Sequence, residues 1–373
     1  MGRYLHGRKA VSTHPAVRTL LIVLPLMAFS FARADPDEKR APTTHELDAV
    51  VYRPLDIAGS GHPLVEQFRK KYRTPFGEKS LATTLANGER YRLYIREQLT
   101  KRNMPAVLEY LPVVESEYRT AARSRSGALG LWQFMENSMA PFLKKSEFID
   151  ERLDPWKSTD AALSKLQDNY SQFQDWALAI TAYNCGAGAL ARTLARSPEK
   201  NFWYLAEHKL LRTETMQYVP KLLAIADLAT NSVYYGLSLP DIQPEVAAEL
   251  SKITNSFDYV TVHGSYSLRW LAAELRIDED TVLELNAALV RGITPPDAVY
   301  AIRLPAGLKA SAHDALATAP FRAFTRRYVV KRGDTLYAIA QAAQTTVQAL
   351  CTANGISEKT PLTVGKVLYL PEK

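Results

Sequence analysis

Apolar side chains return every three or four positions through the middle of the chain. The clearest run is Val107, Leu108, Leu111 and Val114, and strand-like alternation is scarce between residues 90 and 236. A period near 3.6 residues is that of an amphipathic helix with one buried face. The pattern therefore predicts an all-α domain over residues 90–236.

Helix boundaries inside this domain are indicated by polar caps and by prolines. Ser158 and Thr159 precede the apolar residues of segment 161–170 and are candidate N-caps. Pro112 and Pro220 fall within helical patterns. Because proline lacks the backbone N–H donor, each is expected to kink or restart its helix.

After residue 256 the periodicity changes, and the chain contains an internal repeat. The segment that starts at Tyr259 aligns with the one that starts at Arg327 at an offset of 68 residues, which places Asn286 on Asn354. Both copies read strand, helix, helix, strand. Two copies of one small βααβ module are therefore predicted after the helical domain.

The first 34 residues differ in composition from the rest of the chain. Basic side chains precede an apolar run from Leu20 to Phe31, and Ala34 ends a small-residue motif. This order is that of a secretory signal peptide, and the run is too short to cross about 30 Å of hydrocarbon comfortably. Its removal takes away five basic residues and lowers the net charge from +7 to +2. The mature chain then lacks the basic excess typical of nucleic-acid binding.

These patterns divide the chain into consecutive segments. They are a signal peptide (1–34), an N-terminal arm (35–89), the helical domain (90–236), a linker (237–256), the first small module (257–306), a second linker (307–326) and the second small module (327–372). Cys185 and Cys351 fall in different segments, so a disulfide between them is not expected. No cysteine comes directly after the apolar run, so a lipid anchor is not predicted. We expect an exported protein of the Gram-negative periplasm, soluble or associated with the cell wall.

One carboxylate stands out within the helical domain. Glu115 lies at the end of an apolar helical run, and Glu117, two residues on, should point elsewhere on a helix. A carboxyl group among apolar neighbours loses hydration, which raises its pKa and makes it a proton donor near neutral pH. An isolated Glu is more often a surface residue whose stem packs down. The surrounding motifs decide between the two interpretations.

Several short motifs occur in order around Glu115. They are Glu115-Ser116, Gly127-Ala128, Gly130-Leu131-Trp132-Gln133, Ala182-Tyr183-Asn184 and Tyr218-Val219-Pro220-Lys221. In this order and at these separations, residues 91–231 resemble the lytic transglycosylases related to goose-type lysozyme, glycoside hydrolase family 23. The resemblance implies an all-α lysozyme-like catalytic domain that cleaves the glycan strand of peptidoglycan.

The resemblance also implies roles for residues at the matched positions. Glu115 is the expected proton donor to the glycosidic oxygen. The expected substrate-binding residues are Ser124 and Gln133, which contact the sugar or its acetamido group, and Tyr183, Asn184 and Tyr218, which line the cleft. Hydroxyl and amide groups both donate and accept hydrogen bonds, as sugar substituents require. Each also has a structural alternative, such as a turn cap for Ser124 or a core position for the tyrosines.

A second catalytic carboxylate is missing from the matched motifs. Most glycosidases use two, and the nearest candidates in sequence, Glu117 and Glu136, are not at motif positions. The resemblance implies that the 6-hydroxyl of N-acetylmuramic acid attacks its own anomeric carbon, with Glu115 acting as acid and then as base. The product is a 1,6-anhydro sugar. The alternatives are a muramidase-type hydrolase and a non-catalytic peptidoglycan-binding scaffold.

The second small module resembles a LysM domain. Residues 328–371 carry Gly333-Asp334-Thr335-Leu336 and later Asn354 in the expected order, which implies binding to glycan that contains N-acetylglucosamine. The first module has Ser265-Tyr266-Ser267 at the corresponding turn. It is either a glycan-binding module or a degenerate copy retained for packing.

We predict no cofactor, no metal site and no nucleic-acid partner. The sequence has no glycine-rich phosphate loop before a lysine, and its seven histidines lack metal-ligand spacing. The predicted partner is the glycan strand of peptidoglycan, bound by the catalytic domain and by the LysM module. The alternatives for the wider attachment of the protein are a peripheral association with the membrane and an association with the cell wall. A tethered second contact makes rebinding to an insoluble polymer intramolecular.

Overall fold

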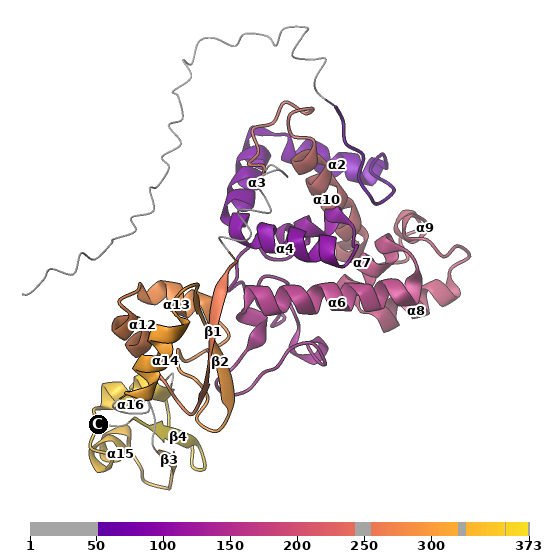
Figure 1. The fold of residues 1–373 in the computed structure, drawn as a ribbon. Coiled ribbons are helices and arrows are strands. Elements are labelled where there is room, and N and C mark those ends of the chain that lie inside the picture. The colour runs from indigo at the N-terminus through magenta and orange to yellow at the C-terminus, as the bar shows by residue number, and fades with distance from the viewer. Residues whose placement is uncertain (1–50, 243–254, 320–325, 355, 372–373) are drawn as a thin grey trace, which may run out of the picture. The chain divides into compact units, whose positions relative to one another are not determined.

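The computed structural model describes residues 51–242, 255–319, 326–354 and 356–371, drawn as the coloured ribbon in Figure 1. The predicted signal peptide lies outside these residues, as does most of the predicted linker at 237–256. Within the described ranges, no helix is both long enough and apolar enough to cross a membrane.

Helices dominate the chain from residue 63 to residue 230, which confirms the predicted all-α domain. The α-helices are α2 (Pro63–Tyr72), α3 (Pro75–Asn87), α4 (Glu89–Lys101), α5 (Leu111–Ser116), α6 (Pro155–Phe173), α7 (Trp176–Cys185), α8 (Ala187–Arg196), α9 (Phe202–Glu207) and α10 (Thr213–Thr230). The 3-10 helices are η1 (Ala106–Tyr110), η2 (Glu136–Ser138) and η3 (Glu151–Leu153).

The described part of the predicted N-terminal arm contains α2 and α3. Val65, Leu81 and Leu85 from these helices are fully buried in the same hydrophobic core as the helices that follow. Helix α2 lies beside α10, as Figure 1 shows. Periodic apolar positions occur only around residues 64–72, where α2 forms, and α3 buries just two large apolar side chains. This part of the arm is an integral layer of the helical domain.

The start of α6 differs from the sequence prediction. Asp154 is the N-cap, and its Oδ1 accepts hydrogen bonds from the backbone N–H groups of Trp156 and Lys157 (3.0 Å each). Ser158 and Thr159 lie buried inside the first turns, so the prediction that they cap this helix is wrong. An aspartate followed by proline at the first helical position starts the helix earlier.

The two prolines inside helical patterns behave differently. Pro112 lies in the first turn of α5, directly after η1, so the helix restarts there as predicted. Pro220 lies inside α10, which continues to Thr230. The restart at Pro112 makes α5 a short helix whose last turn carries Glu115.

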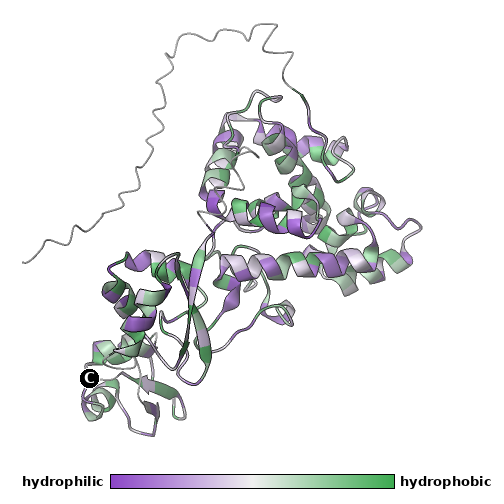
Figure 2. Cartoon of the chain, viewed as in Figure 1, coloured by the Kyte–Doolittle hydropathy of each residue, from purple (hydrophilic) through white to green (hydrophobic). Residues whose placement is uncertain are grey.

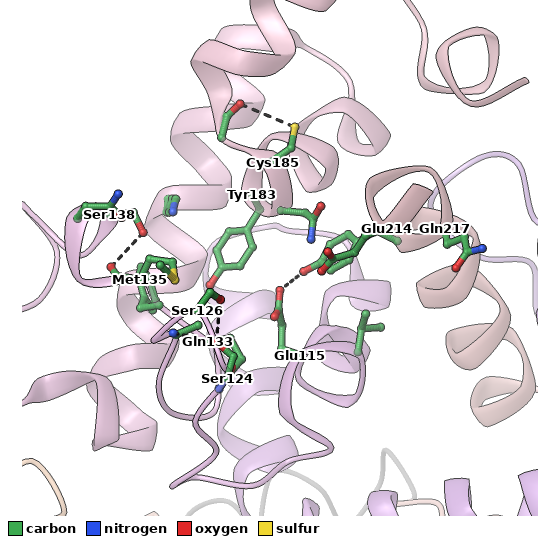
Figure 3. Close-up of a pocket in the computed structure, with 18 of the residues that line it drawn as sticks. Glu115, Ser124, Ser126, Gln133, Met135, Ser138, Tyr183, Cys185, Glu214 and Gln217 are labelled. Atoms are coloured by element: carbon green, nitrogen blue, oxygen red, sulfur yellow. Dashed lines mark hydrogen bonds between the residues drawn. The ribbon is translucent and has the colours of Figure 1, made fainter. Parts of the chain in front are cut away.

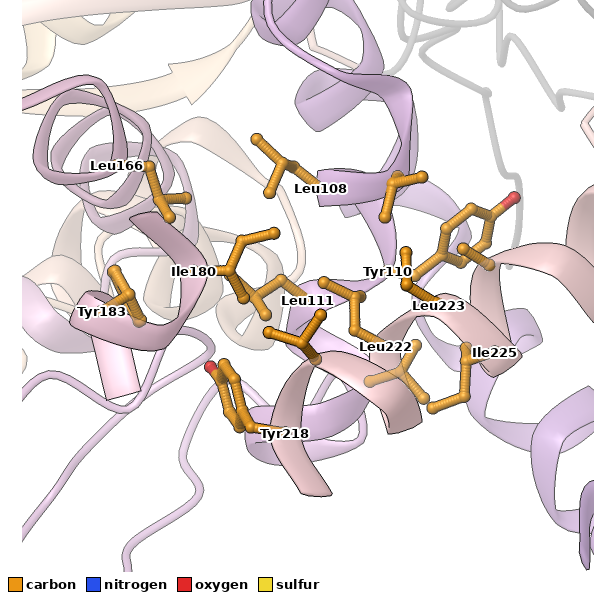
Figure 4. Packing of buried hydrophobic residues seen from close by; sticks show 14 of the residues in the cluster. Leu108, Tyr110, Leu111, Leu166, Ile180, Tyr183, Tyr218, Leu222, Leu223 and Ile225 are labelled. Carbon is orange, nitrogen blue, oxygen red and sulfur yellow. The ribbon is translucent and has the colours of Figure 1, made fainter. Parts of the chain in front are cut away.

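The apolar faces of the helices meet in one core. Figure 2 shows hydrophobic and hydrophilic residues alternating along the helices, as amphipathic packing requires. Leu111, Leu166, Ile180 and Leu222, labelled in Figure 4, are fully buried and come from α5, α6, α7 and α10. Burial of a side chain of this size contributes about 1.5–3 kcal/mol. The packing of Leu111 fixes α5, and with it Glu115.

Each small module folds as predicted, as strand, helix, helix, strand. The first consists of β1 (Phe257–His263), α12 (Leu268–Leu275), α13 (Glu279–Leu285) and β2 (Val299–Pro305). The second consists of β3 (Arg326–Val329), α15 (Leu336–Ala342), α16 (Val347–Asn354) and β4 (Val367–Leu370). In both, the two strands pair antiparallel in a two-stranded sheet.

The aligned asparagines make equivalent contacts in the two modules. Asn286 donates to the carbonyl of Arg303 (2.7 Å) and accepts from its N–H (2.9 Å). Asn354 does the same with Tyr369, at 2.8 and 2.7 Å. Both asparagines are buried. This bridge between the second helix and the closing strand supports the alignment of the two copies.

The segment 307–326, predicted as a linker, contains helix α14 (Lys309–Ala317). Ala312 is fully buried in the core of the first module, and the N–H of Lys309 donates to the carboxylate of Asp258 (2.8 Å). The first module therefore extends beyond its predicted boundary. Small and polar residues make up most of α14, so it has no recognisable apolar stripe.

Candidate active site

The residues assigned to catalysis and substrate binding from the sequence all line one cavity of about 660 Å³. They are Glu115 from α5, Ser124 and Gln133 from the loop between α5 and η2, Tyr183 and Asn184 from α7, and Tyr218 from α10. Figure 3 shows Glu115, Ser124, Gln133 and Tyr183 around the same space. Tertiary packing thus brings together side chains from four separate parts of the helical domain.

Glu115 lies on the last turn of α5, at the wall of the cavity. The helix ends at Ser116 because Glu117 adopts the left-handed conformation (φ 54°), and the side chain of Glu117 is exposed. The prediction that Glu117 points elsewhere is confirmed. The hydroxyl of Tyr218 donates a hydrogen bond to Oε1 of Glu115, which orients the carboxyl group.

Burial raises the pKa of Glu115 to about 7, because removal from water penalises the charged carboxylate. The hydrogen bond from Tyr218 lowers this pKa, the negative charge of Glu214 raises it, and the positive charges of Lys221 and Lys165 lower it. The C-terminal end of a helix also disfavours negative charge. Near pH 7 the carboxyl group therefore exists in both forms, and it can donate or accept a proton.

Tyr183 and Tyr218 combine a buried ring with a hydrogen-bonded hydroxyl. Their side chains are nearly inaccessible, at 8% and 5% exposure. The hydroxyl of Tyr183 donates to the backbone carbonyl of Trp132 (2.9 Å), whereas that of Tyr218 donates to the carboxyl group of Glu115. Burial raises the pKa of both phenols well above the usual value. Both hydroxyls therefore stay neutral hydrogen-bond donors.

Ser124 and Gln133 organise the loop beside the cavity. The hydroxyl of Ser124 accepts from the N–H of Ala128 (2.9 Å), which is the turn-capping role that the sequence left open. Gln133 has a positive φ (48°), and its Nε2 donates to the carbonyls of Ala122 (3.0 Å) and Gly130 (2.8 Å). These bonds use both amide hydrogens, so the amide oxygen is the part of Gln133 that can accept from a ligand.

Asn184 offers the complementary group. Its Oδ1 accepts from the hydroxyl of Thr215 (2.9 Å), so its NH₂ group can donate to a ligand. Helix α7 ends one residue later, at Cys185, because Gly186 takes a positive φ (87°). The cavity thus presents an amide acceptor and an amide donor on different elements, and such a pair can bind an acetamido group.

Three charged residues that line the cavity have no role in the sequence prediction. They are Glu214, Lys165 and Lys221. Glu214 and Lys221 lie four residues before and three residues after Tyr218 on α10, so helical spacing places them near its face. Lys165 comes from α6, and nothing in the local sequence connects it to Glu115.

Neither of the two acids considered from the sequence as a second catalytic carboxylate lines the cavity, whereas another acid does. Glu136 is exposed and paired with Lys145 outside it, and that hydrogen bond lowers the pKa of Glu136. Glu117 does not line the cavity either, whereas Glu214 does. Proximity in sequence to Glu115 is therefore a poor guide to the acids that share its cavity.

Three protein-family models match this chain, and each covers one of the three structural regions described above. Residues 92–206 match the transglycosylase SLT domain, residues 256–320 the LysM-like domain of lytic transglycosylase MltD, and residues 328–371 the LysM domain. The SLT match ends before Tyr218, so the place of Tyr218 in the site rests on the structure.

Two curated relatives resemble about half of the chain. Both are membrane-bound lytic murein transglycosylase D, from Escherichia coli strain K12 and from Escherichia coli O6:H1, and both are 37% identical over 187 residues. The match covers 48% of this chain and 40% of each relative, so the chain spans less than half the length of these relatives. The chain carries a helical transglycosylase SLT domain followed by a LysM-like module and a LysM domain.

Proposed function

We propose that this chain is a peptidoglycan lytic transglycosylase that cleaves the β-1,4 bond between N-acetylmuramic acid and N-acetylglucosamine. The observation that carries the proposal is Glu115, a carboxyl group with a pKa of about 7 held by Tyr218 at the wall of a polar cavity. The SLT match and the two murein transglycosylase relatives support it.

In the proposed reaction, one carboxyl group serves as acid and then as base. Glu115 donates its proton to the glycosidic oxygen while the bond from that oxygen to the anomeric carbon of N-acetylmuramic acid breaks. The 6-hydroxyl oxygen of the same sugar forms the new bond to the anomeric carbon, and its proton passes to the Glu115 carboxylate. No water is consumed, Glu115 returns to its acid form, and a 1,6-anhydro end results. A pKa near the working pH suits both transfers.

Substrate binding follows from the groups left free in the cavity. The oxygen of Gln133 and the NH₂ group of Asn184 match the donor and the acceptor of an acetamido group. The hydroxyl of Ser124 accepts from Ala128 and lies 3.0 Å from the hydroxyl of Ser126, and its remaining hydrogen-bonding capacity allows a further contact with the sugar. Tyr183 and Tyr218 are nearly inaccessible, so we propose that they shape the cavity through their bonds to Trp132 and Glu115.

Glu214 favours a second candidate, a muramidase-type hydrolase. A hydrolytic glycosidase needs a second carboxylate to activate water or to attack the sugar, and Glu214 lines the same cavity as Glu115. In that reaction the product carries a reducing end. Glu214→Gln should then remove the reducing-end product, whereas a transglycosylase reaction does not require this carboxylate as a base.

The test is the identity of the released product. Residues 35–373 are incubated with peptidoglycan sacculi, and the soluble muropeptides are identified by mass spectrometry. We expect anhydro-muropeptides, which are lighter by one water molecule than hydrolysed ones. Dominant reducing-end products identify a hydrolase instead. No released product despite binding to sacculi identifies a non-catalytic scaffold.

Replacing Lys165 by methionine is expected to shift the pH profile of the reaction upward. The change removes a positive charge that lowers the pKa of Glu115, so this pKa rises and the acid form persists to higher pH. The alkaline limb of kcat/KM therefore moves to higher pH, as measured on soluble glycan fragments. Lys101→Met, outside the cavity, is the control. An unmoved or lowered limb contradicts the expectation.

The LysM domain implies binding to peptidoglycan, and we propose that its ligand is the N-acetylglucosamine-containing glycan strand. Its tethering to the catalytic domain raises the local concentration of enzyme on the wall. We further propose that the protein is exported to the periplasm and associates with the wall there. The relatives named as membrane-bound murein enzymes support a location in the cell envelope.

A further inference from the structure

A short segment of the helical domain, residues 144–154, pairs with the first small module. The N–H of Asp150 donates to the carbonyl of Ala288 (2.8 Å), and the N–H of Val290 donates to the carbonyl of Phe148 (3.1 Å). Between these bonds the two backbones form an antiparallel bridge. Backbone pairing of this kind sets a register between the segment and the module.

A buried ion pair accompanies the backbone contacts. Arg303, on β2, contacts both carboxylate oxygens of Asp154 (3.2 and 3.1 Å), and the two residues are only 6% and 2% exposed. The guanidinium carbon lies 4.5 Å from the ring centroid of Trp156 and 5.4 Å from that of Phe257. A charge buried this far is stable only with its partner in place.

The same segment supports the loop beside the cavity. Arg152, held by Asp150 (2.8 and 2.6 Å), donates to the backbone carbonyl of Phe134 (3.4 Å). Gly130 packs directly on the carbonyl oxygen of Arg152, since a Cβ at this glycine would come within 1.9 Å of it. The carbonyl of Gly130 in turn accepts from the side chain of Gln133. The contacts therefore form a continuous path from the first module to the cavity.

We propose that the first small module is a fixed support of the catalytic cavity, and that Arg303 is a positioning residue for the loop that carries Ser124 and Gln133. The partner of this face of the module is the helical domain of its own chain. Asp154 couples the two, because it binds Arg303 and also caps α6, the helix that carries Lys165 into the cavity. Only the activity readout of this inference rests on the proposed transglycosylase function.

The test uses the full chain with Arg303→Met, which removes the charge and keeps most of the apolar stem. Hydrogen exchange in residues 124–134 is expected to become roughly tenfold faster, while exchange in α7 stays as in the wild type. A general loss of stability speeds exchange in both regions. On peptidoglycan, kcat/KM is expected to fall about tenfold, because misplacement of binding groups by a fraction of an ångström impairs the transition state.

The matched control is Arg269→Met. Arg269 is an exposed arginine of the same module whose ion pair with Glu279 (3.2 Å) lies at the surface, so its loss has little effect. Arg303→Lys keeps a cation but lacks the planar fork, and it is expected to lie between wild type and Arg303→Met. If Arg303→Met does not fold, the same exchange measurement is made on Arg303→Lys.

Unchanged exchange in residues 124–134 in the folded Arg303 variants overturns the proposal, as does equal acceleration in α7. An absence of product from every variant, wild type included, counts against the proposed function. It leaves the exchange result to decide the role of the module.

Discussion

Replacing Glu115 by glutamine is expected to lower the turnover of peptidoglycan by a factor of about 10³ or more, within the range that general acid–base catalysis supplies. Glutamine keeps the shape of the side chain and can still accept the hydrogen bond from Tyr218. It has no proton to donate to the leaving oxygen, and it cannot take one from the attacking hydroxyl. Both halves of the proposed reaction are therefore lost. The measurement is the initial rate of anhydro-muropeptide release from sacculi.

The fold should tolerate this change. The carboxylate of Glu115 is penalised by burial, as its raised pKa records, and a neutral amide avoids that penalty. Thermal unfolding of Glu115→Gln should thus occur at or above the wild-type temperature. Glu117→Gln is the matched control, two residues away and exposed, and it should keep near-wild-type turnover. If Glu115→Gln turns over peptidoglycan as fast as Glu117→Gln, Glu115 is not the catalytic acid.

Replacing Asp227 by alanine is expected to cost about 3–5 kcal/mol of folding free energy, the range for breaking a buried ion pair from one side. Asp227 is fully buried and accepts hydrogen bonds from Arg69 (2.6 Å), Tyr235 (2.7 Å), Tyr52 (2.9 Å) and Asn231 (2.9 Å). Alanine leaves the guanidinium and the polar groups without their acceptor. The melting temperature of the helical domain should fall by roughly 10 °C.

The readout for this change is tryptophan fluorescence during unfolding, since four of the five tryptophans lie between residues 132 and 203. Glu66→Ala is the matched control, because it removes the other carboxylate bound to the same Arg69. That pair (3.0 Å) lies near the surface, and its loss should cost at most about 1 kcal/mol. Similar losses for the two variants would show that the buried network around Asp227 is not a main support of the fold.

Several features of the fold are readable from the sequence because their signals lie in the pattern and order of residues along the chain. The helical period of residues such as Leu108 and Leu111 reports one buried face, and the repeat that places Asn286 on Asn354 reports one module used twice. The motifs from Glu115 to Tyr218 carry the family resemblance that implies the site residues, and all of these residues line one cavity. Pro112 marks the restart of α5, which sets Glu115 on its last turn.

Other features are missed where the local signal is weak or points to the wrong residue. Ser158 and Thr159 have the right chemistry for a cap, but Asp154 and the following proline start α6 first. Helices α3 and α14 carry small and polar residues, so they show no clear apolar stripe. For α3 and α14, packing against a neighbouring element stabilises a helix whose own sequence signals it poorly.

The sequence by itself determined the helical domain and the repeated βααβ module, which follow from periodicity and repetition. It also determined Glu115 as the candidate acid, which follows from the family resemblance that the ordered motifs carry. Only the tertiary structure decided the electrostatics of the site. It brought Tyr218, Glu214 and Lys165 from two distant helices to the carboxyl group. It also paired Arg303 with Asp154. The pKa of a buried group depends on lost hydration and on charges across space, and neither is a property of the residues next to it in the chain.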